Sequence, residues 1–180
     1  RSAMRVLLAY VRDEAYFHLL PPGRDGARSA SGRGGGSSRR PGSERVRVMA
    51  FPPLGIQTLA PVLRLAGHEV SMFDTCHPQM RAEHLEAALD TDRPDVVALS
   101  FLSVTAYPAL HRLATRLKAR APRTPIIVGG AFASMNADLL LRDCPAVDAV
   151  GVGEGEDLLP DYLDHLGEPG QVAGLVWRRG

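Results

Sequence analysis

The chain has 180 residues and a net charge of +1, and 45% of its residues are hydrophobic. That length is sufficient for one domain with a substantial core, whereas the near-neutral charge excludes a general attraction to nucleic acid or acidic lipid. Because there is no run of about 18 apolar residues and no secretory signal, we expect a cytoplasmic protein with neither nucleic acid nor a membrane as a partner.

Two segments are set apart from the fold prediction. Residues 1–3 precede Met4 and are interpreted as a vector remnant. Seven arginines lie between Arg24 and Arg47 among Gly, Ser and Pro, so residues 22–45 are predicted to form a mobile insertion. The excess of arginine over the single lysine, Lys118, is typical of a GC-rich bacterial genome.

Strand and helix patterns then alternate along the chain. Apolar runs predict strands at Arg5–Tyr10, His68–Phe73, Asp95–Ser100, Pro125–Val128 and Ala149–Val152. Apolar residues at helical spacing predict helices at Leu54–Ala66, Gln79–Leu89, Tyr107–Ala121, Ala137–Arg142 and Glu156–Leu166. A last extended segment is predicted at Gly174–Arg178. Short right-handed crossovers favour an α/β fold of the flavodoxin-like (Rossmann-like) type, a five-stranded parallel sheet in the order 2-1-3-4-5 with helices on both faces.

Small residues gather where two of these strands end. Ser100 closes one apolar run, and Gly129 and Gly130 close the next. Since ligands of such sheets bind beyond the carboxyl ends of the strands, this predicts a narrow slot for a long, flat, nucleotide-like ligand tail. The alternative for the glycine pair is a tight strand-to-helix turn, and for Ser100 a hydroxyl bonded to its own loop.

An ordered set of segments carries a resemblance to one family. The segments are Pro52-Pro53-Leu54-Gly55, Ala66-Gly67-His68-Glu69-Val70 leading to Asp74, Ser100-Phe101-Leu102, Gly129-Gly130, Gly153-Glu154-Gly155-Glu156 and Gly174-Leu175-Val176-Trp177-Arg178. The chain resembles the N-terminal cobalamin-binding domain of cobalamin-dependent radical S-adenosylmethionine enzymes.

The resemblance implies a domain at residues 4–172 that holds cobalamin with its nucleotide tail threaded between strand ends. It implies a connector strand at 173–180 toward a radical S-adenosylmethionine barrel, present in cis or in trans, and a parent enzyme that is a methyltransferase. The implied cobalamin-binding residues are Pro53, Leu54, Gly55, Gln57, Ser100, Leu102, Ser103, Thr105, Gly129, Gly130, Gly153, Glu154 and Gly155. Tyr107 is a further candidate, with a packing aromatic as its alternative.

No cobalt ligand is apparent. Carriers similar to methionine synthase place Asp-x-His-x-x-Gly after the first strand, whereas residues 51–57 here read Phe-Pro-Pro-Leu-Gly-Ile-Gln. Cobalamin is therefore expected base-off and also His-off, with His77 as the one histidine to test. Cys76 and Cys144 have no metal-ligand spacing, and both are interpreted as structural.

The Cys-x3-Cys-x2-Cys motif that would hold the family's iron-sulfur cluster is absent from these 180 residues. The cluster and S-adenosylmethionine are therefore expected only in a further domain, and this chain alone is not expected to catalyse a reaction. The sequence leaves open whether the chain is a piece of a longer enzyme or a standalone carrier. A flavin- or nucleotide-binding module, and a degenerate interaction module that no longer holds cobalamin, also remain as alternatives.

Overall fold

The computed structural model describes residues 2–13, 53–77 and 80–179. The prediction of a mobile insertion at 22–45 lies outside the described residues, as do Pro52 and Gln79.

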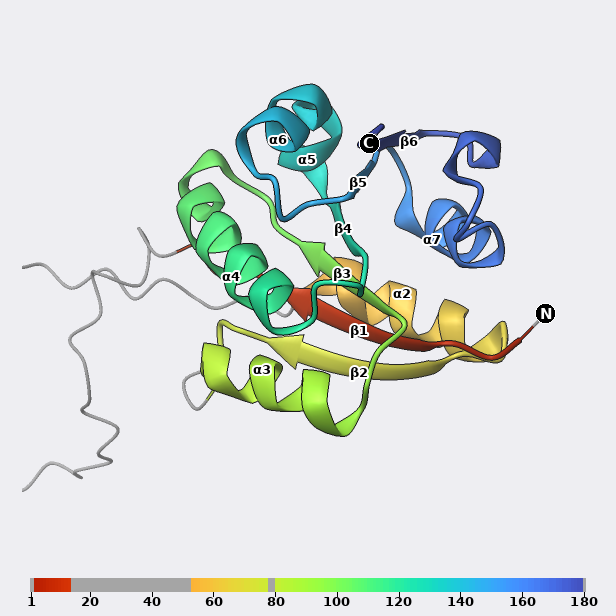
Figure 1. Ribbon diagram of the computed structural model, residues 1–180, viewed down its shortest axis with the longest axis horizontal. Helices are drawn as coiled ribbons and strands as arrows, with labels where there is room; N and C mark the ends of the chain where they lie inside the picture. The colour runs from red at the N-terminus through yellow and green to blue at the C-terminus, as the bar shows by residue number, and fades with distance from the viewer. Residues whose placement is uncertain (1, 14–52, 78–79, 180) are drawn as a thin grey trace, which may run out of the picture.

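One sheet contains all the strands of the described residues, in the order β2-β1-β3-β4-β5-β6 (Figure 1). The strands are β1 Arg5–Tyr10, β2 Glu69–Asp74, β3 Val96–Ser100, β4 Ile126–Gly129, β5 Ala149–Gly151 and β6 Leu175–Trp177. The first five pair in parallel, which confirms the flavodoxin-like order 2-1-3-4-5. The sixth extends this sheet, because the segment predicted only as an extended connector pairs antiparallel with β5.

Helices follow the parallel strands. They are α2 Leu54–Leu65, α3 Ala82–Thr91, α4 Tyr107–Arg120, α5 Ala131–Met135, α6 Ala137–Asp143 and α7 Gly155–Asp164, with single 3₁₀ turns at Val104–Ala106 and Pro169–Gln171. α3 begins later than the sequence pattern predicts, because the backbone N–H of Arg81 donates to Nδ1 of His84 and so caps the helix at Arg81. The short α5 was not predicted.

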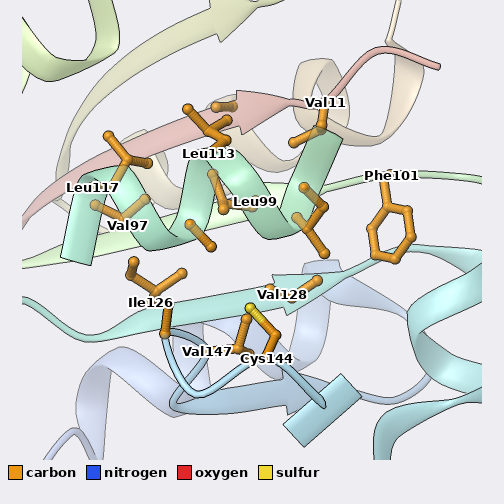
Figure 2. Packing of buried hydrophobic residues seen from close by; sticks show 14 of the residues in the cluster. Val11, Val97, Leu99, Phe101, Leu113, Leu117, Ile126, Val128, Cys144 and Val147 are labelled. Atoms are coloured by element: carbon orange, nitrogen blue, oxygen red, sulfur yellow. The ribbon is translucent and has the colours of Figure 1, made fainter. Parts of the chain in front are cut away.

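The two faces of the sheet are covered by different helices. α3, α4, α5 and α6 cover one face, where the largest group of buried side chains lies. Figure 2 shows Leu113 and Leu117 of α4 over Val97 and Leu99 of β3. α2 and α7 cover the other face.

On the face covered by α2 and α7, the side chains become smaller along the strands. Leu8, Ala98 and Ile127 project their side chains into the core beneath α2 and α7. Two residues further along β3 and β4, the positions on the same face are Ser100 and Gly129. The volume of the side chains therefore falls sharply toward the carboxyl ends of these strands.

A carboxylate fixes the opposite end of the sheet. Oδ2 of Asp148 accepts hydrogen bonds from Nζ of Lys118 at 2.7 Å and from the backbone N–H of Ile126 at 2.6 Å. Lys118 also donates to the carbonyl of Thr124 at 3.0 Å. Asp148 thus joins the end of α4 to the start of β4.

Asp148→Ala is expected to lower the free energy of unfolding by about 1–2 kcal/mol, because it leaves a partly buried ammonium group and a backbone N–H without their acceptor. Asp148→Asn keeps one oxygen for the Ile126 N–H and should cost less. Urea denaturation followed by circular dichroism measures both, and equal stability of Asp148→Ala and the wild type would contradict this account.

Candidate functional site

A cavity of about 410 Å³ lies between α2 and α7, at the carboxyl ends of β3, β4 and β5. Strand residues form its floor, α2 forms one wall and α7 the other. This is the edge of a doubly wound sheet at which ligands bind.

The floor consists of residues with little or no side chain. Ser100 pairs in register with Gly129 across β3 and β4, and Gly151 contributes from β5. A Cβ added at Gly129 would meet no atom within 4 Å, so the missing side chain leaves open space. Gly129 therefore keeps the floor of the cavity clear.

Gly130 has a different role from Gly129, although the two glycines are adjacent and were predicted to act together. Its φ is +105°, and a Cβ there would lie 2.3 Å from the carbonyl oxygen of Phe101. The turn from β4 into α5 therefore requires glycine at this position whether or not a ligand binds.

Gly130→Ala is expected to destabilise the protein by about 2–4 kcal/mol, because it adds a backbone clash to a strained φ. The matched control Gly129→Ala should change the free energy of unfolding by less than about 1 kcal/mol. Urea denaturation measures the free energy of unfolding of both variants. Equal losses of stability in the two variants would refute the different roles of Gly129 and Gly130.

The walls approach each other closely beside the floor. A Cβ at Gly155 would lie 3.1 Å from Cδ2 of Leu59. The glycine at the start of α7 therefore permits α7 to contact α2. At the exposed mouth, Thr58 Oγ1 donates to Glu156 Oε1 at 2.6 Å and joins the two helices. Glu156 thus acts as a link between the walls of the cavity.

The loop after β5 is also tied down. The backbone N–H of Gly153 donates to Oγ of Ser134, which follows β4, at 3.2 Å. Gly153 has a φ of +100°, and a Cβ there would meet no atom within 4 Å. Glu154 is exposed beside it.

The structure brings together seven of the residues implied by the resemblance. Those that line the cavity are Gly55, Ser100, Gly129, Gly130, Gly153, Glu154 and Gly155. Pro53 is buried just before α2, whereas Leu54, Gln57 and Leu102 are exposed at or near the same edge. These four do not line the cavity.

The remaining candidates bond elsewhere. The hydroxyls of Ser103 and Thr105 both donate to Oδ2 of Asp13, and so connect the segments that follow β3 and β1. The Tyr107 hydroxyl donates to Asp143, and burial, together with that bond, raises the pKa of Tyr107. None of the three lines the cavity.

The apolar walls of the cavity were not predicted from the sequence. They are formed by Ile56 and Leu59 of α2 and by Leu158 and Leu159 of α7. In the sequence these residues have the spacing of ordinary core positions. The available signal was Gly155, whose missing side chain marks the close approach of the helices.

Metal-ligating side chains do not gather in the described part of the chain, where no group of three or more His, Cys, Asp or Glu residues has suitable geometry. No histidine of this part lines the cavity, and His77 is exposed in the turn after β2. The described helices include none with the length and apolarity needed to cross a bilayer.

The Cys76 thiol lies in the same turn. Burial, reinforced by the charge of Asp74, raises the pKa of Cys76 from 9.0 to about 12. The thiol therefore stays protonated near neutral pH, which suits a structural side chain.

Alkylation of Cys76 by iodoacetamide at pH 8 is expected to be at least about tenfold slower in the folded chain than in urea, since only the thiolate reacts. Mass spectrometry of the peptide that contains Cys76 measures the rates. Equal rates in the two states would contradict the raised pKa.

The fold and the cavity together define a flavodoxin-like α/β domain with a cavity at the carboxyl edge of its sheet. The model of the B12 binding domain family matches residues 45–163 of the chain. The chain belongs to this family.

Three curated relatives are larger proteins. The chain is 38% identical over 132 residues to hopanoid C-3 methylase of Methylococcus capsulatus, covering 71% of this chain and 25% of the relative. It is 26% identical over 139 residues to anaerobic magnesium-protoporphyrin IX monomethyl ester cyclase of Synechocystis, 75% of this chain and 28% of the relative. It is 28% identical over 146 residues to cytidylyl-2-hydroxyethylphosphonate methyltransferase of Streptomyces wedmorensis, 70% of this chain and 27% of the relative.

The chain thus spans about a quarter of the length of these relatives. The family match and the relatives confirm the resemblance stated in the sequence analysis.

Proposed function

We propose that the chain is the cobalamin-binding domain of a larger cobalamin-dependent radical S-adenosylmethionine enzyme and holds cobalamin base-off and His-off. The observation that carries this proposal is the cavity between α2 and α7, whose floor at Ser100 and Gly129 lacks bulky side chains. Such a cavity suits the nucleotide tail of cobalamin, which is long and flat.

The polar groups of the cavity also suit this tail. Ser100 lines the cavity, and its Oγ makes no hydrogen bond with another described residue. This oxygen faces the start of α2, since a Cβ added to Gly55 would lie 3.8 Å from it. The proposed role of this hydroxyl is to donate to the free nitrogen of the base, an interaction worth about 1 kcal/mol net. The backbone of Gly155, the first residue of α7, lines the cavity where it can contact ribose or phosphate oxygens.

The proposed His-off state rests on the lining of the cavity. No histidine among the described residues lines it, and α2 opens with Leu54 and Gly55 directly after Pro53. The described part of the chain therefore supplies no imidazole at the cavity to replace the base, and we propose that the residues around the tail fix the position of cobalamin.

Exposed apolar side chains lie at the same edge of the sheet. Leu54 is 69% exposed and Leu102 is 61% exposed. Contact with an apolar ligand surface would remove these side chains from water, and we assign the two leucines to the flat face of the corrin. Pro53 and Gln57, which lie within three residues of Leu54 in the chain, are proposed to contribute to the same contact.

Cobalamin, when bound, supplies a cobalt centre able to carry a methyl group. The proposed parent enzyme is a methyltransferase, which the names methylase and methyltransferase of two relatives support. Its radical domain, in cis or in trans, would hold the iron-sulfur cluster and S-adenosylmethionine. This chain would bind and orient the corrin beside that domain.

Titration of the 180-residue chain with hydroxocobalamin is expected to give a base-off absorption spectrum, with the corrin co-migrating with protein in gel filtration. Gly129→Val should weaken binding at least about tenfold, because the added side chain fills the floor of the cavity. The matched control Gly167→Val, in open space after α7, should bind like the wild type.

Two results would overturn the proposal. Absence of any corrin in the protein fraction at saturating hydroxocobalamin would favour a flavodoxin-like module that does not hold cobalamin. Unchanged binding by Gly129→Val would show that the tail lies outside the cavity.

A further inference from the structure

The deep part of the cavity is apolar. Leu8, Ala98 and Ile127 of the strands, together with Ile56 and Leu159 of the helices, contribute side chains that are all at most 8% exposed. These residues belong to the core between the sheet and the pair α2 and α7. A group that enters this part of the cavity is surrounded by hydrocarbon.

The polar side chains of the lining lie at the mouth and have other partners or are exposed. Glu156 accepts from Thr58 at 2.6 Å, and Ser134 accepts from the N–H of Gly153 at 3.2 Å. Glu154 is exposed. Among the described side chains that line the cavity, Ser100 therefore provides the hydroxyl on the floor.

The backbone of the floor is engaged as well. The carbonyl of Ser100 accepts from the N–H of Val11 at 2.8 Å, and the carbonyl of Gly129 accepts from the N–H of Phe101 at 3.3 Å. The floor therefore offers a flat base one hydroxyl and otherwise an apolar surface.

Bases at the end of a cobamide tail differ in the number of polar groups they bring. A benzimidazole released from cobalt exposes one ring-nitrogen acceptor, and the rest of its surface is carbon and hydrogen. Adenine exposes that nitrogen together with two further ring nitrogens and an amino group. One hydroxyl satisfies the benzimidazole, whereas adenine would have polar groups left without partners.

We infer that the cavity selects cobamides with a benzimidazole base over cobamides with a purine base. This inference rests on the proposed binding of cobalamin and deepens it, because it assigns the choice of cofactor to the lining of the cavity. The structural basis is the one hydroxyl of the floor, Ser100, above apolar side chains, with the other polar side chains of the lining, Ser134, Glu154 and Glu156, at the mouth.

The test compares three ligands on the wild-type chain: cobalamin, adeninylcobamide, and cobinamide, which lacks the nucleotide and base. Dissociation constants come from equilibrium dialysis with corrin absorbance as the readout. Cobalamin is expected to bind at least about tenfold more tightly than adeninylcobamide, equivalent to 1.4 kcal/mol, and more tightly than cobinamide.

A variant locates the selectivity in the cavity. Ala98→Ser adds a second hydroxyl to the lining and should reduce the preference for cobalamin over adeninylcobamide at least about threefold. The control is Ala149→Ser, because Ala149 is buried on the same face of the sheet but does not line the cavity. Thermal unfolding of both variants verifies that the fold is retained.

The outcomes separate this inference from the proposed function. Tight cobalamin binding with equal affinity for adeninylcobamide overturns the selectivity and leaves the proposed function intact. If cobinamide binds as tightly as cobalamin, the nucleotide tail is not held by the cavity. If cobalamin does not bind, the proposed function is wrong. Either result overturns the inference. A tenfold preference that Ala98→Ser reduces and Ala149→Ser leaves unchanged supports it.

Discussion

Register pairing between β3 and β4 sets Ser100 beside Gly129 on one face of the sheet, and the site depends on this coincidence. The core on this face is filled two residues earlier in β3 and β4, by the side chains of Ala98 and Ile127 together with Leu8 of β1. Apolar packing therefore stops where the small residues begin. α2 and α7 nevertheless meet, because Gly155 admits the Leu59 side chain. A hollow bounded by helices on both sides is the geometric result, and its position follows from side-chain volume alone.

The same strand ends support a packed core on the opposite face. Ser100 belongs to the cavity, whereas Phe101, the next residue, is fully buried and packs with its ring 5.5 Å from that of Phe132. Successive side chains of a strand point to opposite faces. The end of β3 therefore contributes stability on one side and an open floor on the other, without a change in its backbone.

Much of this arrangement was predictable, because the apolar periodicity that fixes each parallel strand lies within a few residues. The antiparallel pairing of Leu175–Trp177 was not, since a short extended segment carries no signal of direction. α5 was missed because its five residues follow the glycine pair directly. Ser103 and Thr105 remain predicted contacts of the ligand, but the bonds of their hydroxyls to Asp13, 90 and 92 residues away in the chain, were not predicted. No local pattern predicts such pairings, nor does one distinguish a cavity-lining Leu59 from a core leucine.

The glycine floor also has a consequence for the entropy of binding. Side chains that order around a ligand lose rotamer freedom, and each such loss weakens association. Gly129 and Gly151 have no rotamers to lose, and Gly129 is held by the pairing of β4 with β3. The floor is thus already in its final form before a ligand arrives. For the proposed ligand, the conformational cost of binding would therefore fall on its flexible tail and on the residues at the mouth of the cavity.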